Sequence, residues 1–554
     1  MSRLPPDAGE SWRPQTPSFR TCLWSTLFIA ALFFAVSLLS SPIPGVNEPH
    51  YLAKARTFQD PTWCSRDFFL TSRNAHYCFF WLVGTLTQWM SFDAIAVLGR
   101  AASSLILAIG WNMLGSSFAM RASLRFLAAC LFATLSLRGS FSGEWLLGGF
   151  ESKVPAWGFA WISLSLWIRA QSAMRVREIW LAGVACGIAC ALHPVVGGWV
   201  AVCVCLASVI LDCQHRTPFS LAAARLSRFA SATVIVSLPG LIPALQLVLD
   251  NSQAKKDREL ATFYQVFWRL KHHLDPTELL ASQWTYAGLM VAIVIGAALL
   301  RSRSNSNTRG QEFANASASK TEPDGIHCLL AIFAMSAAIA MVGVVIGWHA
   351  ESAQKMDGWE WRASLLKFYP FRCFDAMLPI TVAWMLISLV DRRVAKIRTG
   401  RGTLGMVGLC ILGSLVPLQL AWYQREMTPA GYTARQFADW QAACEWIRIN
   451  TPSDALVLTP RESYAFKWFA ERAEFVCYKD CPQDTAGILM WNSRLWMLHD
   501  WTLKSSSDGL YDAGDLKLLQ KKTNVDFVLT RILGPFDTPP IWKSGEWQIY
   551  TVPR

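Results

Sequence analysis

Charged residues are scarce in this chain of 554 residues: they make up 16% of the sequence, whereas hydrophobic residues make up 53%. An ordinary soluble protein carries about a quarter of its residues as charged side chains. The apolar residues also stand in long runs, and Thr21–Ser41 contains no charged residue. About 20 such residues span the hydrocarbon core of a bilayer. The composition therefore excludes an ordinary soluble enzyme and predicts a polytopic membrane protein, whose first partner is the lipid bilayer.

The net charge of +12 does not predict a nucleic-acid partner here. Lys and Arg stand mostly in short connections between apolar runs, which is the distribution that the positive-inside rule gives to cytoplasmic loops. The connections with this excess are 119–125, 169–177, 212–228, 301–325 and 391–401. The segments expected outside are then 42–75, 138–153, 193–198, 250–282, 349–372 and the chain after 421.

The fold class predicted is mainly α: a polytopic membrane helix bundle of about 11–12 spans over residues 21–421. Tyr77–Met90 is short for a span and is expected to lie along the surface, which leaves eleven. Residues 1–20 are expected to form a cytoplasmic tail, and the polar segment 302–324 a disordered cytoplasmic linker. The eleven spans are predicted within Thr21–Ser41, Phe92–Phe118, Phe126–Leu137, Val154–Ile168, Ile179–Leu211 (two helices), Phe229–Leu249, Trp284–Leu300, Ile326–Trp348, Phe374–Val390 and Thr403–Ala421.

From about residue 430 to 554 the pattern changes to short strands between amphipathic helices, which predicts a small extracytoplasmic α/β domain. This part has no GxGxxG and no GxxxxGK[ST] run, so nothing in it indicates nucleotide binding. Strands are expected at 455–459, 474–478, 525–530 and 547–552, and helices at 436–449, 463–470, 484–501 and 515–522.

Among 15 cysteines, those inside apolar runs are read as small hydrophobic residues. Two pairs on the predicted outer side, Cys64 with Cys78 and Cys477 with Cys481, are candidates for disulfides, which spacing alone does not establish.

Polar side chains recur at the outer ends of the predicted spans, where charge is costly unless it is paired or used. Carboxylates there are candidates for a general base or a metal ligand, and cations and imidazoles are candidates for holding a phosphate. The catalytic candidates are Glu48, His50, Glu144 and Glu151. The substrate-binding candidates are Tyr51, Lys153, His193, Arg269, Lys271, His272, His273 and Arg372.

Each of these residues also has a purely structural interpretation. Glu48 pairs equally well with Lys54 or Arg56, and Arg372 with Asp375 three positions later. His193 precedes a proline, where a histidine often makes a helix-end hydrogen bond. The adjacent pair at 272–273 lacks the ligand spacing that zinc requires.

Several runs in the sequence resemble members of the GT-C superfamily, integral-membrane glycosyltransferases that use polyprenyl-phosphate-linked sugars. The resemblance covers most of the chain and lies in its layout: a first span, a long outer loop with an early acidic residue, many further spans and a final α/β domain. Where the superfamily usually has an acidic pair, this chain has Asn47-Glu48. The runs that resemble an uncharacterised bacterial multi-pass family of this layout are GEWLLGGFESK, HPVVGGW, KHHLDP, YPFRCFD and WIRINTPSDALVLTPRESYAFKWFAERAEFV.

The resemblance implies a glycosyltransferase of the bacterial inner membrane that transfers a sugar from a polyprenyl phosphate to an extracytoplasmic acceptor. Glu48 would then be the catalytic base or the ligand of a divalent cation (Mg or Mn), with Glu144 or Glu151 as a second acidic motif. Two other classes remain open: a transporter or flippase of a lipid-linked or polar solute, and a non-catalytic membrane scaffold. A transporter predicts charges deep within spans, and Arg100 is the clear example.

Overall fold

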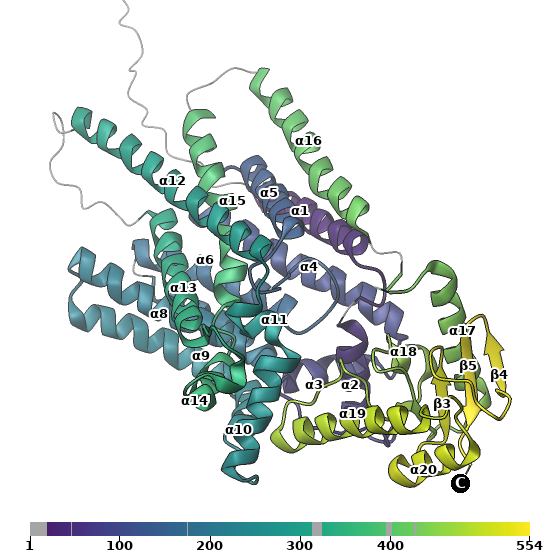
Figure 1. Ribbon diagram of the computed structural model, residues 1–554. Helices are drawn as coiled ribbons and strands as arrows, with labels where there is room; N and C mark the ends of the chain where they lie inside the picture. Colours follow the sequence, from purple (N-terminus) through teal and green to yellow (C-terminus); the bar gives the residue numbers. More distant parts are fainter. Residues whose placement is uncertain are drawn as a thin grey trace, which may run out of the picture.

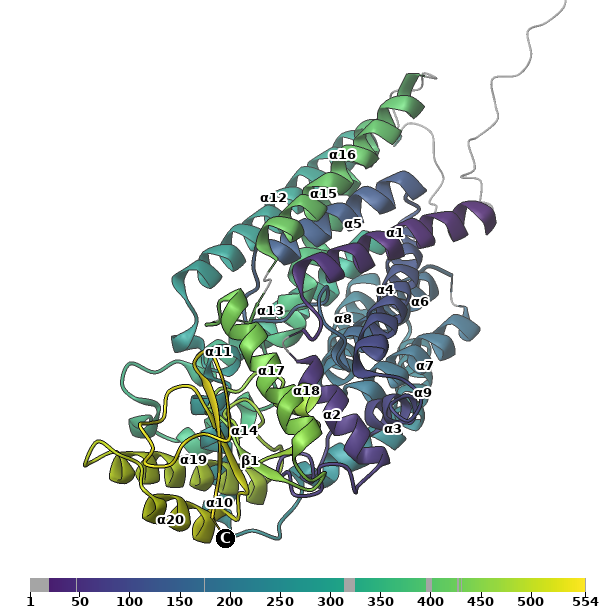
Figure 2. The same ribbon diagram turned by 90° about the vertical axis from the view of Figure 1, so that its right-hand side faces the viewer.

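The computed structural model describes residues 19–45, 47–173, 175–312, 324–394, 401–425, 428–429 and 431–553. Most of the predicted tail and the centre of the predicted linker lie outside these ranges. Within them, helices form one large bundle, and a small sheet with its own helices lies at one end of the molecule (Figures 1 and 2).

Eight helices in the described ranges are long and apolar enough to span a membrane, so the chain is an integral membrane protein. Three more helices in the described ranges coincide with predicted spans and pack among the eight, but they do not meet the length and apolarity of a span, so eight of the eleven expected spans are confirmed. The eight are α1 (Phe19–Ser40), α4 (Phe92–Ser117), α8 (Pro194–His215), α9 (Phe219–Val248), α12 (Ala281–Glu312), α13 (Gly325–Gly347), α15 (Arg372–Val394) and α16 (Arg401–Gln424). The three are α5 (Ala122–Arg138), α6 (Lys153–Ala173) and α7 (Val176–Leu192).

Short helices lie in the segments that connect the spans. The helix α3, at ten residues, is about 15 Å long and too short to cross a bilayer, as predicted for this segment. These short elements are α2 (Glu48–Gln59), α3 (Tyr77–Leu86), α10 (Lys255–Phe263), the π-helical turn η1 (Tyr264–Arg269), α11 (Lys271–Leu274), the 3-10 turns η2 (Pro276–Glu278) and η3 (Ala353–Lys355), and α14 (Trp359–Leu366).

Aromatic rings and glycines set how closely the spans pack. Trp111 of α4 stacks on Trp384 of α15, with ring centroids 4.6 Å apart, and both rings are fully buried. Helices α7 and α9 touch along their length. At Gly240 of α9 a side-chain carbon would lie 2.1 Å from the carbonyl oxygen of Ala191, so only glycine fits there.

The C-terminal layer, which we define as residues 434–551, contains a five-stranded sheet of order β2-β1-β3-β5-β4. The strands β1, β2 and β3 pair in parallel, and β5 pairs antiparallel to β3 and β4. Helix α17 covers one face, and α19 and α20 cover the other. The elements are α17 (Ala434–Asn450), β1 (Leu456–Leu458), α18 (Phe466–Ala470), β2 (Ala473–Glu474), α19 (Thr485–Ser505), α20 (Ala513–Thr523), β3 (Phe527–Thr530), β4 (Trp542–Ser544) and β5 (Trp547–Thr551).

Three expectations differ from the structure. The strand β4 was not anticipated, because its segment is short and half-exposed. The predicted linker begins as a helix, since α12 continues to Glu312. All the cysteines in the described ranges are free thiols, so neither proposed disulfide is present.

The first outer loop, 42–75, packs against the C-terminal layer. Ala53, Cys64, Phe69 and Leu70 share one hydrophobic core with residues of β1, β3, α19 and α20. This contact places the layer next to the polar segments from which the site is built.

Candidate active site

A cavity of about 1700 Å³ lies where the spans, the outer loops and the C-terminal layer meet. Its polar end is lined by the segment after α5, by α2, by the segment around α11 and by the loop after β2. Ten of the twelve candidate residues from the sequence line it: His50, Tyr51, Glu144, Glu151, Lys153, His193, Arg269, His272, His273 and Arg372. The candidate residues therefore form one part of the cavity wall.

The other end of the cavity is an apolar arm along α8, α9 and α13. Gly198 leaves room in its wall, because a side-chain carbon there would meet nothing within 4 Å. Several large apolar side chains on these three helices are between two-fifths and three-fifths exposed. They are Val202, Leu206, Leu245, Val248 and Val342. Since all five belong to helices that qualify as spans, this arm lies at the depth of lipid.

Glu144 is held by three neighbours at the polar end. Its Oε1 accepts a hydrogen bond from Trp157 Nε1 at 2.9 Å. Its Oε2 lies 3.2 Å from Arg372 Nε and 3.5 Å from Lys153 Nζ. The carboxylate is thus buried but neutralised by two cations.

Glu151 shares one of these cations. Lys153 Nζ lies 2.8 Å from Glu151 Oε1, and Glu151 Oε2 accepts a hydrogen bond from Asn47 Nδ2 at 2.8 Å. One network of ion pairs therefore joins Glu144, Glu151, Lys153 and Arg372.

Asp375 of α15 holds the loop that carries Glu144 in place. Its carboxylate accepts hydrogen bonds from the backbone N–H groups of Phe141, Ser142 and Glu144 at 2.5, 2.8 and 2.9 Å. Asp375 thus has a structural role. The spacing in the sequence indicated a pair with Arg372, but the partners of Asp375 are backbone N–H groups of the loop.

Arg372 keeps part of its donor capacity. Its Nη1 lies 3.0 Å from His193 Nε2, which must accept because a guanidinium only donates. Its Nε faces Glu144, and no described residue bonds Nη2. A second arginine, Arg269, donates through Nη2 to the carbonyl oxygen of Lys479 at 2.9 Å, while its buried Nε has no partner in the described ranges. Both arginines line the cavity with N–H groups to spare.

The C-terminal layer contributes residues that the sequence did not single out. Tyr464, Tyr478 and Lys479 line the cavity. Burial lowers the pKa of Lys479 to about 8, against the attraction of Asp480. The signal available in the sequence was the polar run Tyr478–Cys481 directly after a predicted strand, although nothing in that run indicates which side it faces.

His50 reaches the C-terminal layer as well as the cavity. Its Nδ1 lies 3.0 Å from Asp480 Oδ1, and its ring packs on Phe69 with centroids 4.3 Å apart. His273 Nδ1 instead donates to the carbonyl oxygen of Ser142, and burial lowers the pKa of His273 to about 3. Both imidazoles are neutral at pH 7.

Glu48 does not line the cavity, in contrast to the expectation for it. It is fully buried and forms a two-point ion pair with Arg100, with Nε–Oε1 and Nη2–Oε2 distances of 2.7 Å. Its oxygens also accept hydrogen bonds from the backbone N–H groups of Gly45 and Phe150. Arg100, the charged residue within α4, is therefore paired, and Glu48 has no oxygen left to act on a substrate.

Lys271 is the other candidate that lies elsewhere. It is about half exposed, pairs with Glu278 at 2.9 Å and does not line the cavity. This pair is exposed to solvent and of the kind that contributes little.

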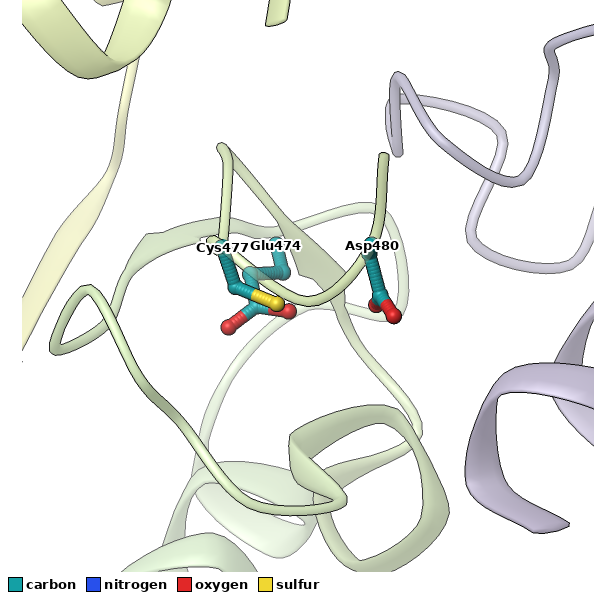
Figure 3. Close-up of side chains that lie close together, drawn as sticks. All are labelled: Glu474, Cys477 and Asp480. Atoms are coloured by element: carbon teal, nitrogen blue, oxygen red, sulfur yellow. The ribbon is translucent and has the colours of Figure 1, made fainter. Parts of the chain in front are cut away.

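One group of three side chains has the makings of a metal site but is already occupied by a lysine. Glu474, Cys477 and Asp480, on the segment from β2 onward (Figure 3), have ligand atoms within 4.8 Å of one another. The Nζ atom of Lys467 lies 2.7 Å from Glu474 and 2.6 Å from Asp480. Burial raises the pKa of the Cys477 thiol, which keeps it protonated. The ammonium thus takes the place that a cation would take.

Comparisons with known proteins give a partial match by sequence and a broader one by fold. Residues 438–498 match a family described as a domain of unknown function (DUF6798). No curated protein matches the chain.

Two crystal structures of the oligosaccharyltransferase of Archaeoglobus fulgidus are similar to this chain. The apo form has 14% sequence identity and a TM-score of 0.44, covering 92% of this chain and 69% of that one. The complex with Zn and sulfate has 13% identity and a TM-score of 0.46, covering 91% and 67%.

Proposed function

We propose that this protein is a membrane-embedded glycosyltransferase that moves a sugar from a polyprenyl-phosphate donor to an extracytoplasmic acceptor. The observation that carries the proposal is the single cavity that joins a cationic polar end to an apolar arm at lipid depth. A donor of this class has the same two parts: a charged phosphate with its sugar, and a long hydrocarbon chain.

The polar end offers donors for the phosphate. Arg372 Nη2 and Arg269 Nη1 are N–H groups without partners in the described ranges, and arginine suits the oxygens of a phosphate. Lys153 and Lys479 add positive charge on either side. As the bond between sugar and phosphate breaks, negative charge grows on the leaving phosphate, and these fixed cations stabilise it.

A divalent cation does not fit the carboxylates of this site. Both oxygens of Glu48 are taken by Arg100 and by backbone N–H groups. Glu144 and Glu151 already face Lys153 and Arg372. Mg or Mn therefore has no part in the proposed transfer.

The proposal also places the protein in a bacterial inner membrane, with the amino terminus in the cytoplasm and the C-terminal layer outside. The excess of Lys and Arg in alternate connections supports this orientation. A transporter or flippase is less well supported, because Arg100, the charge within a span that favoured it, is paired and outside the cavity.

The Arg372→Ala variant tests the proposal. Wild-type protein in detergent is expected to unfold at a higher temperature when undecaprenyl phosphate is added, and Arg372→Ala is expected to lose at least about tenfold in affinity because a charge-assisted contact contributes about 1.5–3 kcal/mol. Lys271→Ala, which removes a cation outside the cavity, is the matched control and should bind as the wild type does. Absence of binding by the wild type would contradict the proposal.

A further inference from the structure

His50 and Asp480 join two distant parts of the chain at the cavity. His50 lies in the first turn of α2 and Asp480 in the segment after β2, 430 positions later. Because a carboxylate only accepts hydrogen bonds, the proton of the neutral ring is on Nδ1. The lone pair is then on Nε2.

Asp480 is fixed from its other side. Its Oδ2 lies 2.6 Å from Lys467 Nζ, and the same ammonium lies 2.7 Å from Glu474 and 3.3 Å from Asp67. Burial alone would raise the pKa of Asp480, but the Lys467 ammonium holds it well below its usual range. Asp480 is therefore a permanent, immobile acceptor for His50.

The second nitrogen of His50 is available to a ligand. No hydrogen bond joins Nε2 to any residue in the described ranges, and the side chain keeps 23% of its surface exposed where it lines the cavity. Burial lowers the pKa of His50, and Asp480 opposes this effect. The ring is thus neutral at pH 7 and can accept a proton.

The two glutamates of the polar end are already engaged by other side chains. Glu144 faces Arg372 and Lys153, and Glu151 faces Lys153 and Asn47. Trp157 holds the remaining oxygen of Glu144, so all four carboxylate oxygens of the two glutamates already have partners. His50, by contrast, is uncharged and has a nitrogen without a partner.

We propose that His50 Nε2 is the proton acceptor for the acceptor hydroxyl, and that Asp480 is the positioning residue that fixes the His50 tautomer. This inference rests on the proposed glycosyl transfer. In the step, the O–H bond of the acceptor breaks and its proton goes to Nε2, while the oxygen bonds the anomeric carbon of the sugar. The bond from that carbon to the phosphate oxygen breaks, and its electron pair leaves with the polyprenyl phosphate. The C-terminal layer thereby completes the site.

The charged groups around His50 set the direction of its titration. Asp480 favours the protonated ring, whereas Lys54 and Lys479 oppose it. His76, which lies on the same side, is itself neutral because burial lowers its pKa to about 3. Activity is therefore expected to fall only when the pH drops below the ordinary histidine range.

The first experiment separates binding from turnover. Undecaprenyl phosphate binding is measured by thermal unfolding, and turnover by release of radiolabelled sugar from a panel of undecaprenyl-phosphate-linked hexoses with water as acceptor. His50→Gln should bind within about threefold of wild type and lose roughly 100-fold in kcat, since general base catalysis contributes 10²–10⁴-fold. Wild-type turnover by His50→Gln would overturn the inference, whereas failure of the wild type to bind undecaprenyl phosphate would overturn the proposed function.

Asp480→Asn distinguishes positioning from a structural role. The variant keeps the shape of the side chain but removes the charge that raises the pKa of His50. Its kcat should fall by about tenfold or more with little change in KM, and the acid limb of its pH profile should move to lower pH. An unchanged profile would contradict the role of Asp480.

A chemical probe tests His50 without any substrate. Diethyl pyrocarbonate acylates neutral imidazoles with an open nitrogen, and mass spectrometry locates the modified residue. In the folded wild type His50 should be modified, and His193, which is buried and has a partner on each ring nitrogen, should react at least about tenfold more slowly. An unmodified His50 would overturn the inference whatever the substrate is.

Discussion

At the scale of single residues, the pair Glu48–Arg100 shows how a membrane protein neutralises a buried charge. Both side chains have no exposed surface, and the guanidinium also donates to the carbonyl oxygens of Ser37, Ser41 and Pro42. Arg100 thus ties α4 to the end of α1 and to the start of the first outer loop. Such a buried pair contributes little to the net free energy of unfolding. Removal of one partner is nevertheless costly, because it leaves the other charge buried and unpaired.

We therefore predict that Glu48→Gln destabilises the protein by about 3–5 kcal/mol, the usual cost of removing one partner of a buried pair. The measurement is the midpoint of thermal unfolding in detergent. The double variant Glu48→Gln/Arg100→Leu removes both charges and should recover much of the loss. A single variant with wild-type stability and no turnover would instead return Glu48 to the catalytic role predicted from the sequence.

At the scale of elements, the close approach of α7 and α9 depends on Gly240. A side-chain carbon there would lie 2.1 Å from Ala191 O, too close for a real contact, so any larger residue pushes α9 away. Since Leu241, Ala244 and Leu245 of α9 line the apolar arm, this packing also sets the shape of the cavity.

Gly240→Val is expected to cost about 1–3 kcal/mol, the range for an overpacked core, and to weaken binding of undecaprenyl phosphate. Thermal unfolding with and without the lipid measures both effects. Gly288→Ala in α12 is the control, because a side-chain carbon there meets nothing within 4 Å. Equal stability of the two variants would mean that α9 shifts without cost.

At the scale of the whole molecule, a buried ionic cluster holds the C-terminal layer to the first outer loop. Lys467 of α18 faces Asp67 of that loop as well as Glu474 and Asp480 of its own layer. Asp67 also accepts a hydrogen bond from the backbone N–H of Glu474 at 2.9 Å. The contact therefore joins two parts of the chain that are 400 residues apart.

Lys467→Met should loosen this contact, because three buried carboxylates lose their shared cation. We expect limited trypsin treatment to release the C-terminal layer from the variant faster than from the wild type, as followed by gel electrophoresis. Lys517→Met, at an exposed position of α20, is the control. Equal cleavage of Lys467→Met and the control would show that hydrophobic packing alone holds the layer.

Eight of the eleven spans and most of the strands and helices of the C-terminal layer could be predicted from the sequence, because they depend on local patterns of apolar residues. The strand β4 could not, since its segment is short and half-exposed. The wall of the cavity could be predicted in part, since charged residues at span ends gather on one side. The ion-pair and hydrogen-bond partners of these charged residues could not be predicted. Glu48 has equally plausible partners nearby at 54 and 56, yet it pairs with Arg100, and nothing local links His50 to Asp480. Such pairs are set by helix packing, which a single sequence does not show.

The apolar arm along α8, α9 and α13 has a kinetic consequence. On the proposed function, a lipid-linked donor that enters along this arm is drawn from the bilayer and never crosses water, so its effective concentration is a surface density. Adding detergent or inert lipid at a fixed amount of donor then slows the reaction by surface dilution. The supply of donor in the cell is likewise counted per area of membrane and not per volume.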